Sequence, residues 1–574
     1  MSIKADILVI GAGGAGCRAA IEAAECYPQS RILVLSQGPV GRSGLTVMAN
    51  GGMLWVTHPD DKPEYLFREI LSAGAYLNDQ NLVEILTQEG TLRGNELINW
   101  GAQELDFSVV SKIGGAAPDE QGTGHSFPRH HYIPGITYMT ALRKELERRS
   151  NITIMEDVIA TMLLITGDRA VGATILNIRT GEILSIEAKS TILATGGLGE
   201  LYDHSSNTPF GLYGHASGMG YALAYHAGAE LIDMEMIQFT GNQLYPPWLL
   251  GNPALLISKC GGKYINAHGD EFMKLPLTRD ETQILAHKEI EKGNGTERGG
   301  VFIDLTLSPL SSEEIGEEMK NTLAVDLCKE RWKLIEAMSA ENPDPKNWRI
   351  EFTPGGAHFS MGGVRINEKC ETSIKGLYAA GEVAGGVQGA NRMGGNALME
   401  IIVFGARAGR YAGEFANSTT WVELETQTLN AEHNRLHDFF RTGDVAPRTV
   451  MDKIAAIMSK YVAVSRKGGG LKQAISDFES LRSNDLPQMR VPRVKTFNSQ
   501  WVEAVQAVYM LDLAEMITRS ALFRSESRGA HYREDFPQRD PAWLKHTCVT
   551  QKDGTVNLGT VPIKVTKQSL EGLR

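Results

Sequence analysis

The chain has 574 residues, of which 42% are hydrophobic and 22% are charged, and its formal net charge at pH 7 is −11. Such a length exceeds what one hydrophobic core usually serves, so we expect roughly two to four domains. The acidic balance argues against broad binding to nucleic acid or anionic membranes, because neutralising phosphates requires clustered Lys and Arg. Six scattered cysteines without a Cys-x-x-Cys pair argue against a zinc site or an iron–sulfur cluster in this chain.

The first predicted strand, residues 6–10, lies so close to Met1 that it leaves no room for a secretory signal. No apolar run approaches the roughly 20 residues that cross a bilayer. We therefore expect a cytoplasmic protein with reduced thiols, or one held peripherally on the inner face of a membrane through partner subunits.

The N-terminal segment predicts a βαβ unit. Residues 6–10 form an apolar run of buried-strand length, residues 17–25 an alanine-rich helix, and residues 31–35 a second strand. The turn before the helix has the G-x-G-x-x-G pattern, in which glycines permit a tight turn, close approach of a pyrophosphate and close helix packing. The pattern therefore predicts a Rossmann-type dinucleotide site with the glycines Gly11, Gly13, Gly14 and Gly16.

The second strand ends at Ser36, where an NAD enzyme usually has an acid that binds the adenosine ribose. This serine argues against a plain NAD enzyme. Ser36 is our candidate contact on the adenosine side of the dinucleotide.

The middle of the chain predicts further strands. Residues 151–155, 162–177 and 183–188 have the pattern of strands in a small sheet. Residues 190–194 predict a buried strand that ends in the glycine turn Thr195-Gly196-Gly197. Such a turn lets a ligand approach the backbone, although alone it also fits an ordinary strand-to-loop connection.

Changes in glycine content and in periodicity suggest the domain organisation. A segment with little glycine interrupts the dinucleotide-binding domain, so we expect a discontinuous α/β domain with an inserted α+β capping domain. A helical domain follows, and turn residues near its end predict a C-terminal hairpin. The expected ranges are 1–236 and 351–419 for the dinucleotide-binding domain, 237–350 for the capping domain, 420–548 for the helical domain and 549–574 for the tail.

The densest cluster of glycines lies at residues 376–400, where two turns lead into a predicted helix. Such a turn offers backbone N–H groups to an anionic or electron-rich ligand, and Arg392 adds a planar cation. Residues 390–398 resemble the Ala-Asn-Arg-Leu-Gly-Ser-Asn-Ser-Leu signature of the fumarate reductase and succinate dehydrogenase flavoprotein family. The departures from that signature are Met393, Gly395 and Ala397.

The resemblance spans most of the chain and implies FAD as the cofactor. Residues 527–531 look like the C-terminal Ser-Arg-Gly-Ala-His block of the family, and residues 42–52 resemble the segment that runs along the flavin. Many members attach FAD through a histidine of that segment; here Leu45 stands in its place, so the resemblance implies non-covalent FAD. Besides the glycines above, the implied FAD contacts are Ser43, Gly44, Asn50, Gly51, Gly52, Thr195, Gly196, Gly197, Gly381, Glu382, Arg392, Asn396, Ala397 and Leu398.

The resemblance also implies three catalytic residues. His358 lies in a segment similar to the family's His-Tyr-Thr-Met-Gly-Gly and would bind a substrate carboxylate. Arg392 would bind the other carboxylate. Arg279, followed by Asp280, resembles the capping-domain Arg-Asp pair whose arginine donates a proton. Taken singly, each of these residues also fits a structural role or a surface ion pair.

Two segments depart from the family pattern. Residues 238–241 read Gln-Phe-Thr-Gly where the family usually has Gln-Phe-His-Pro-Thr-Gly, and residues 257–262 lack its Thr-Glu and Arg-Gly-Glu-Gly. A substrate histidine, a relay glutamate and a second arginine therefore have no clear counterparts. Lys259 adds positive charge there, and the aromatic residues of segment 245–248 favour either a bulkier substrate or simple core packing.

We therefore expect an FAD-dependent oxidoreductase, the flavoprotein subunit of a fumarate reductase or succinate dehydrogenase type of complex. It would transfer hydride between flavin N5 and the double bond of a carboxylic acid, and exchange electrons with a separate iron–sulfur subunit. Two other flavoenzymes of the family remain open, an L-aspartate oxidase and an adenylylsulfate reductase. A flavin-bound assembly subunit without turnover is the non-enzymatic alternative. We expect no nucleic-acid partner.

Overall fold

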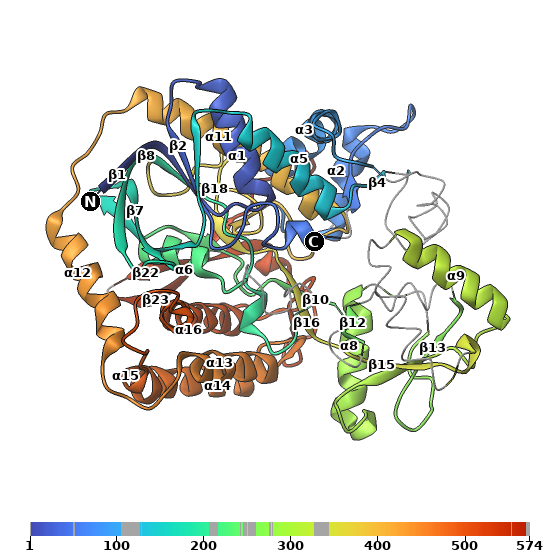
Figure 1. Cartoon of the computed structure of the whole chain (residues 1–574). Helices are drawn as coiled ribbons and strands as arrows, with labels where there is room; N and C mark the ends of the chain where they lie inside the picture. The colour runs from blue at the N-terminus through green and yellow to red at the C-terminus, as the bar shows by residue number, and fades with distance from the viewer. Residues whose placement is uncertain are drawn as a thin grey trace.

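The computed structural model describes residues 2–49, 52–104, 127, 129–205, 216–240, 243–244, 249–250, 260–274, 277, 279–325, 342, 344–552 and 554–569. Two of the expected FAD contacts, Asn50 and Gly51, lie outside these residues, as do Lys259 and segment 245–248. Of Arg279 only the backbone is described. Figure 1 shows the chain in three parts, which we call the main domain, the cap and the helical domain.

A seven-stranded sheet forms the centre of the main domain (Figure 1). Its strands, in spatial order, are β5 (Ile152–Met155), β2 (Ile32–Leu35), β1 (Ser2–Ile10), β8 (Ile183–Leu193), β7 (Arg169–Asn177) and β6 (Val158–Thr166), and β18 (Leu377–Ala379) also pairs with β8. The strands β5, β2, β1, β8 and β18 run parallel, whereas β7 and β6 continue the sheet antiparallel. The prediction that residues 151–188 form a separate small sheet was therefore wrong.

Helices pack closely on this sheet because glycines remove side chains between them. The helix α1 (Gly14–Cys26) lies against α11 (Asn396–Ser418), and a Cβ on Gly409 of α11 would come within 2.1 Å of the Ala19 carbonyl oxygen of α1. Other helices of the main domain are α2 (Pro63–Ala73), α3 (Gln80–Asn99), α5 (Gly135–Glu147) and α6 (Met219–His226). The strands β3 (Gly52–Leu54) and β4 (His130–Tyr132), which lie far apart in the sequence, form an antiparallel pair.

The cap has a sheet and a small hydrophobic core of its own. Its sheet has the order β12 (Leu249–Leu250), β11 (Gln243–Leu244), β15 (Arg349–Thr353), β14 (Val301–Asp304) and β13 (Lys263–Ile265). Its helices are α8 (Arg279–Glu289), which continues into a π turn at Ile290–Asn294, and α9 (Ser312–Val325). The core of the cap is the buried cluster Tyr264, Met273, Ala286, Val301, Ile303 and Phe352.

Two antiparallel strands connect the cap to the main domain. The chain enters the cap after β10 (Ile237–Thr240) and returns through β16 (Gly356–Ser360), which pairs with β10. We call this pair the hinge strands. In Figure 1 they lie between the main domain and the cap, beside α8.

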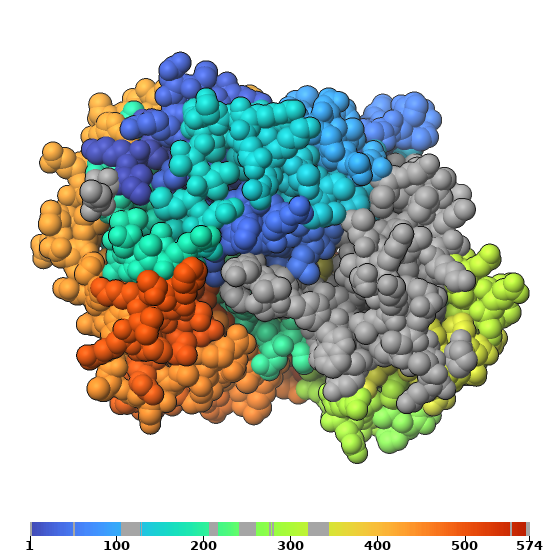
Figure 2. Space-filling view, in the orientation of Figure 1, coloured from blue at the N-terminus to red at the C-terminus, as the bar shows by residue number. Residues whose placement is uncertain are grey.

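Helices α12 (Thr426–His437), α13 (Pro447–Tyr461), α14 (Gly468–Ser480), α15 (Leu486–Gln488) and α16 (Ser499–Phe523) form the helical domain. A C-terminal hairpin follows, with β22 (Lys545–Lys552) and β23 (Thr555–Pro562), so its first strand begins before residue 549. The hairpin joins a five-stranded sheet with β9 (Leu231–Ile232), β17 (Gly363–Arg365) and β19 (Ala384–Gly385). Figure 2 shows the helical domain and hairpin, in orange and red, packed directly against the main domain.

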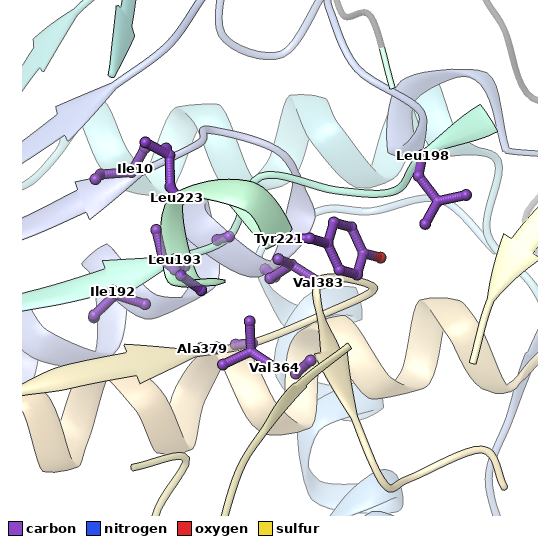
Figure 3. Close-up of a cluster of buried hydrophobic side chains, with 14 of the residues drawn as sticks. Ile10, Ile192, Leu193, Leu198, Tyr221, Leu223, Val364, Ala379 and Val383 are labelled. Atoms are coloured by element: carbon purple, nitrogen blue, oxygen red, sulfur yellow. The ribbon is translucent and has the colours of Figure 1, made fainter. Parts of the chain in front are cut away.

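The main core lies where the parallel strands end. Figure 3 shows Ile10 of β1, Leu193 of β8 and Ala379 of β18 packed with Tyr221 and Leu223 of α6. All five side chains are buried. The backbone turns that follow these three strands therefore start from a rigid platform, and they are the turns for which the sequence predicts a cofactor.

Candidate functional site

The first glycine turn is closed on one side and open on the other. A Cβ on Gly16 would lie 1.8 Å from the Gly11 carbonyl oxygen, and one on Gly11, whose φ is +104°, would lie 2.2 Å from the Ala194 carbonyl oxygen. Among the described atoms, a Cβ on Gly13 would meet only Thr46 Oγ1, at 3.8 Å. Gly11 and Gly16 are thus needed for packing, whereas Gly13 leaves backbone accessible to a ligand at the start of α1.

The second turn follows β8 and meets Glu382. A Cβ on Gly197 would lie 2.2 Å from Glu382 Oε1, and Gly196, with φ of +78°, has no described atom within 4 Å of its Cβ position. The Thr195 hydroxyl oxygen is enclosed, without a hydrogen-bond partner among the described residues. The Thr195 hydroxyl packs against Gly220 of α6, where a Cβ would lie 1.8 Å from it, so the part of this turn that a ligand can approach is the backbone at Gly196.

The start of α11 forms the third turn. Gly395 precedes the helix with a left-handed backbone (φ 85°), and Asn396 is buried as its first residue. Gly381, with φ of +75°, approaches Ala15 of α1, so a Cβ there would lie 2.9 Å from the Ala15 Cβ. The first N–H groups of α1 and α11 have no partner within their own helices, and so both helix starts can bind anionic or carbonyl oxygens.

Glu382 faces a mixed environment within these turns. Its Oε1 accepts a hydrogen bond from the Ser360 N–H at 3.0 Å, and the Tyr221 hydroxyl donates to its backbone oxygen at 2.6 Å. Loss of solvent raises the pKa of Glu382 to about 7, against the opposite effects of the Ser360 N–H and the Arg392 cation. The carboxyl group can therefore accept or donate a hydrogen bond near neutral pH.

The hydroxyls of the two predicted serines are engaged in local turns. Ser36 Oγ donates to the Gly38 carbonyl oxygen at 2.6 Å, and Ser43 Oγ donates to the Pro39 carbonyl oxygen at 2.8 Å. Each oxygen retains acceptor capacity. Their contacts with FAD stay predictions.

The structure brings Arg392 to the hinge strands. Its guanidinium is buried, its Nη2 donates to Gln238 Oε1 of β10 at 3.0 Å, and its Nη1 donates to the Met393 carbonyl oxygen at 3.2 Å. Its Cζ lies 5.0 Å from the ring centroid of Phe359 on β16. Arg392 therefore packs on the residue that follows His358.

His358 lines a small cavity of about 10 Å³ with residues from four segments of the main domain. Leu45 comes from the segment expected along the flavin, Leu198 from the turn after β8, and Glu382 from the turn after β18. The cavity thus joins three of the segments predicted to bind FAD. Leu45, in the position where a histidine would attach the cofactor, is among its walls.

Arg279 is the first residue of α8, which packs on the hinge strand β10. Gln283 of the same helix accepts a hydrogen bond from the Gly355 N–H at 3.1 Å, just before β16. The backbone of Arg279 thus belongs to a helix fixed to both hinge strands. Its side chain lies outside the described residues, and its proton-donor role stays a prediction.

Sequence reasoning did not identify Gln238 or Glu400 as site residues. Gln238 contacts Arg392, and buried Glu400 accepts a hydrogen bond from Gln388 Nε2 at 2.6 Å. The only local pattern that could have pointed to Glu400 was its spacing from Asn396, because residues four apart lie on the same face of α11. Both contacts with the turn at 388–392 depend on tertiary structure.

The glycine turns and the two helix starts fit a dinucleotide with a polar ring system. Among the described residues no cluster of His, Cys, Asp and Glu could hold a metal ion. No described helix is both long enough and apolar enough to cross a membrane.

Comparisons with known proteins agree with this geometry. Residues 6–398 match the family model of an FAD binding domain, and residues 451–571 match the fumarate reductase flavoprotein C-terminal model. One relative, from the fumarate reductase (CoM/CoB) of Methanothermobacter marburgensis, is 36% identical over 96% of this chain and 97% of its own length. The Escherichia coli fumarate reductase flavoprotein subunit is 29% identical over 98% of this chain and 95% of its own.

Solved structures show the same relationship. A structure of E. coli quinol fumarate reductase FrdA superposes with a TM-score of 0.86 at 27% identity, and covers 99% of this chain and 98% of its own. Adenylylsulfate reductase of Archaeoglobus fulgidus shares the fold, with a TM-score of 0.76 at 20% identity over 98% of this chain and 96% of its own. The expected α/β fold with an inserted cap and a C-terminal helical domain is confirmed. The chain belongs to the fumarate reductase and succinate dehydrogenase flavoprotein family and is an FAD-dependent oxidoreductase.

Proposed function

We propose that this chain transfers hydride between FAD and the carbon–carbon double bond of a small carboxylic acid, as fumarate reductases do by name. The observation that carries the proposal is Arg392, a buried guanidinium that packs on Phe359 beside His358. Bound FAD supplies the hydride. Arg392 and His358 hold the carboxylates of the substrate, and their charge and hydrogen bonds favour electron withdrawal from the double bond.

Arg279 supplies the proton in this proposal. Its support is the position of its backbone at the start of α8, the cap helix that packs on the hinge strand β10. An arginine donates a proton only where its cation is disfavoured, because its ordinary pKa exceeds about 12. A second cation such as Arg392 and exclusion of water under the cap both act in that direction.

The proposal includes non-covalent FAD, because Leu45 offers no nucleophilic nitrogen. Its electron-exchange partner is a separate iron–sulfur subunit, because the cysteines of this chain are scattered and similar structures include a quinol-fumarate reductase. The chain would lie in the cytoplasm or on the inner face of a membrane through such partners.

Reoxidation of the reduced protein tests this function. Anaerobic protein reduced with dithionite is expected to recover its oxidised flavin absorbance when fumarate is added. Arg279→Gln should slow this step roughly a hundredfold or more, the usual contribution of a general acid, and keep the flavin spectrum. The matched control is Arg298→Gln, another cap arginine, whose side chain is 58% exposed.

The outcomes separate the alternatives. Failure of fumarate and of a panel of other unsaturated acids to reoxidise the flavin would refute the substrate class and favour an assembly subunit. Rapid reoxidation by oxygen with iminoaspartate formed from aspartate would indicate an aspartate oxidase. Flavin reoxidation at the normal rate in Arg279→Gln would remove Arg279 from the acid role and leave the substrate class intact.

A further inference from the structure

The side-chain amide of Gln238 makes three hydrogen bonds to the turn at Asn391–Arg392, and two of them are to Arg392. Its Nε2 donates to Asn391 Oδ1 at 2.7 Å and to the Arg392 carbonyl oxygen at 3.0 Å, while its Oε1 accepts from Arg392 Nη2 at 3.0 Å. Gln238 is 1% exposed. One amide therefore contacts both the backbone and the guanidinium of the same arginine.

The chemistry of the partners fixes the orientation of this amide. A carbonyl oxygen can only accept a hydrogen bond, and a guanidinium can only donate. The Gln238 NH₂ group must therefore face the Arg392 carbonyl, and its oxygen must face the guanidinium. If the amide were reversed, its oxygen would face the Arg392 carbonyl oxygen, and its NH₂ group would face the guanidinium. Neither pair can form a hydrogen bond, so only one orientation of the amide satisfies both partners.

The hinge strands supply a second restraint on the guanidinium. Gln238 of β10 is in register with Phe359 of β16, and Arg392 Cζ lies 5.0 Å from the centroid of the Phe359 ring. The amide fixes one edge of the guanidinium and the ring supports its face. Arg392 thus keeps one orientation through contacts made by the two strands that connect the cap to the main domain.

We propose that Gln238 is the positioning residue that presets the Arg392 guanidinium for a substrate carboxylate. The proposal rests on the proposed function, in which Arg392 binds that carboxylate. A guanidinium that is already oriented loses little conformational freedom on binding, so the carboxylate is bound more tightly. Among the described side chains of β10, Gln238 is a polar one that contacts Arg392 directly.

Binding of malonate, a saturated dicarboxylate, tests the clamp without turnover. It is measured anaerobically from the change in flavin absorbance of the purified, FAD-loaded protein. Gln238→Leu keeps the size of the side chain, removes all three hydrogen bonds, and is expected to weaken malonate binding at least about tenfold. The KM for fumarate should rise similarly, with kcat changed less than about threefold, because Gln238→Leu loosens the clamp on the carboxylate but keeps the charge of Arg392.

A buried glutamine elsewhere gives the matched control. Gln506 of α16 is also 1% exposed, and its Nε2 has no hydrogen-bond partner among the described residues. Gln506→Leu should therefore preserve malonate affinity. Both variants should retain FAD, and comparing their unfolding midpoints shows whether Gln238→Leu acts through global stability.

A double-mutant cycle separates positioning from a general packing effect. Arg392→Lys keeps the charge but loses the planar fork, so Gln238→Leu should weaken malonate binding far less in that background than alone. Additive effects, or unchanged affinity in Gln238→Leu, would overturn the positioning role while the proposed function stands. A wild-type protein that binds neither malonate nor fumarate would refute both.

Discussion

At the scale of single residues, two acids with raised pKa values distinguish this site. Burial raises the pKa of Glu400 to about 7; the hydrogen bond from Gln388 and the charge of Arg392 act to lower it, and the charge of Glu382 acts to raise it. Glu400 is 2% exposed. Glu382, with its pKa also near 7, lies close enough that ionising one acid disfavours ionising the other.

The titration of Glu400 predicts a pH dependence of stability in the FAD-free protein. Because its pKa is raised from 4.5 to about 7, the folded chain binds more protons than the unfolded chain between these pH values. The free energy of unfolding therefore falls as the pH rises through this window, by on the order of 3 kcal/mol for this group. The side chain in Glu400→Gln cannot ionise, so the free energy of unfolding of this variant should fall less over the same pH range.

Urea unfolding at a series of pH values measures this difference. The matched control is Glu423→Gln, at an exposed position between α11 and α12, which should follow the wild-type profile. Parallel profiles for wild type and Glu400→Gln would show that Glu400 does not titrate in this range.

The sequence pointed to some of these residues and not to others. His358 and Arg392 were predicted from short motifs, and the structure packs Arg392 on Phe359, the neighbour of His358, while their roles stay predictions. Gln238 was noted only within a motif that departs from the family, because its partners Asn391 and Arg392 lie more than 150 positions away. No local pattern encodes a hydrogen bond of that separation.

At the scale of elements, the start of α11 depends on one backbone conformation. Gly395 has φ of 85°, and a Cβ there would lie 2.8 Å from Leu54 Cγ. Gly395→Ala is therefore expected to lower the free energy of unfolding by roughly 1–3 kcal/mol, through a left-handed alanine and a close contact. Urea unfolding of the FAD-free protein measures the loss.

The neighbouring glycine provides the control for this substitution. Gly394 has no left-handed backbone, and no described atom lies within 4 Å of its Cβ position. Gly394→Ala should change the free energy of unfolding by no more than about 0.5 kcal/mol. Equal losses in the two variants would mean that the left-handed turn is not what α11 requires.

The pairing of the strands at residues 151–188 could not be predicted from the strands themselves. Periodicity located the strands at residues 151–188 but not their partners, and these strands extend both edges of the main sheet. β5 adds to β2, whereas β7 pairs with the first half of β8 and β18 with its second half. β8 has eleven residues and is therefore long enough to pair with β7 along one half and with β18 along the other. No pattern within a single strand specifies which strand it pairs with.

At the scale of the whole molecule, the site is assembled from distant parts of the chain. α1 follows the first strand, whereas α11 begins at residue 396, and glycines let the two helices meet. The cap also contacts the segment that follows α16, since Lys288 Nζ of α8 donates to the Tyr532 hydroxyl at 2.9 Å. The discontinuous domain was predictable because two glycine motifs flank the insertion, but these contacts between domains were not.

The proposed non-covalent binding of FAD would depend on the complete fold. The turns at residues 11–16, 195–197 and 381–396 converge only in the folded chain, and Leu45 offers no bond that would survive unfolding. Acid precipitation of the purified protein should therefore leave its FAD in the supernatant and a colourless pellet. As a control, free FAD is added to FAD-free protein before acid precipitation, which measures how much unbound FAD the pellet retains non-specifically. A pellet that stays yellow and fluorescent beyond that amount would establish covalent attachment through a residue other than a histidine at position 45.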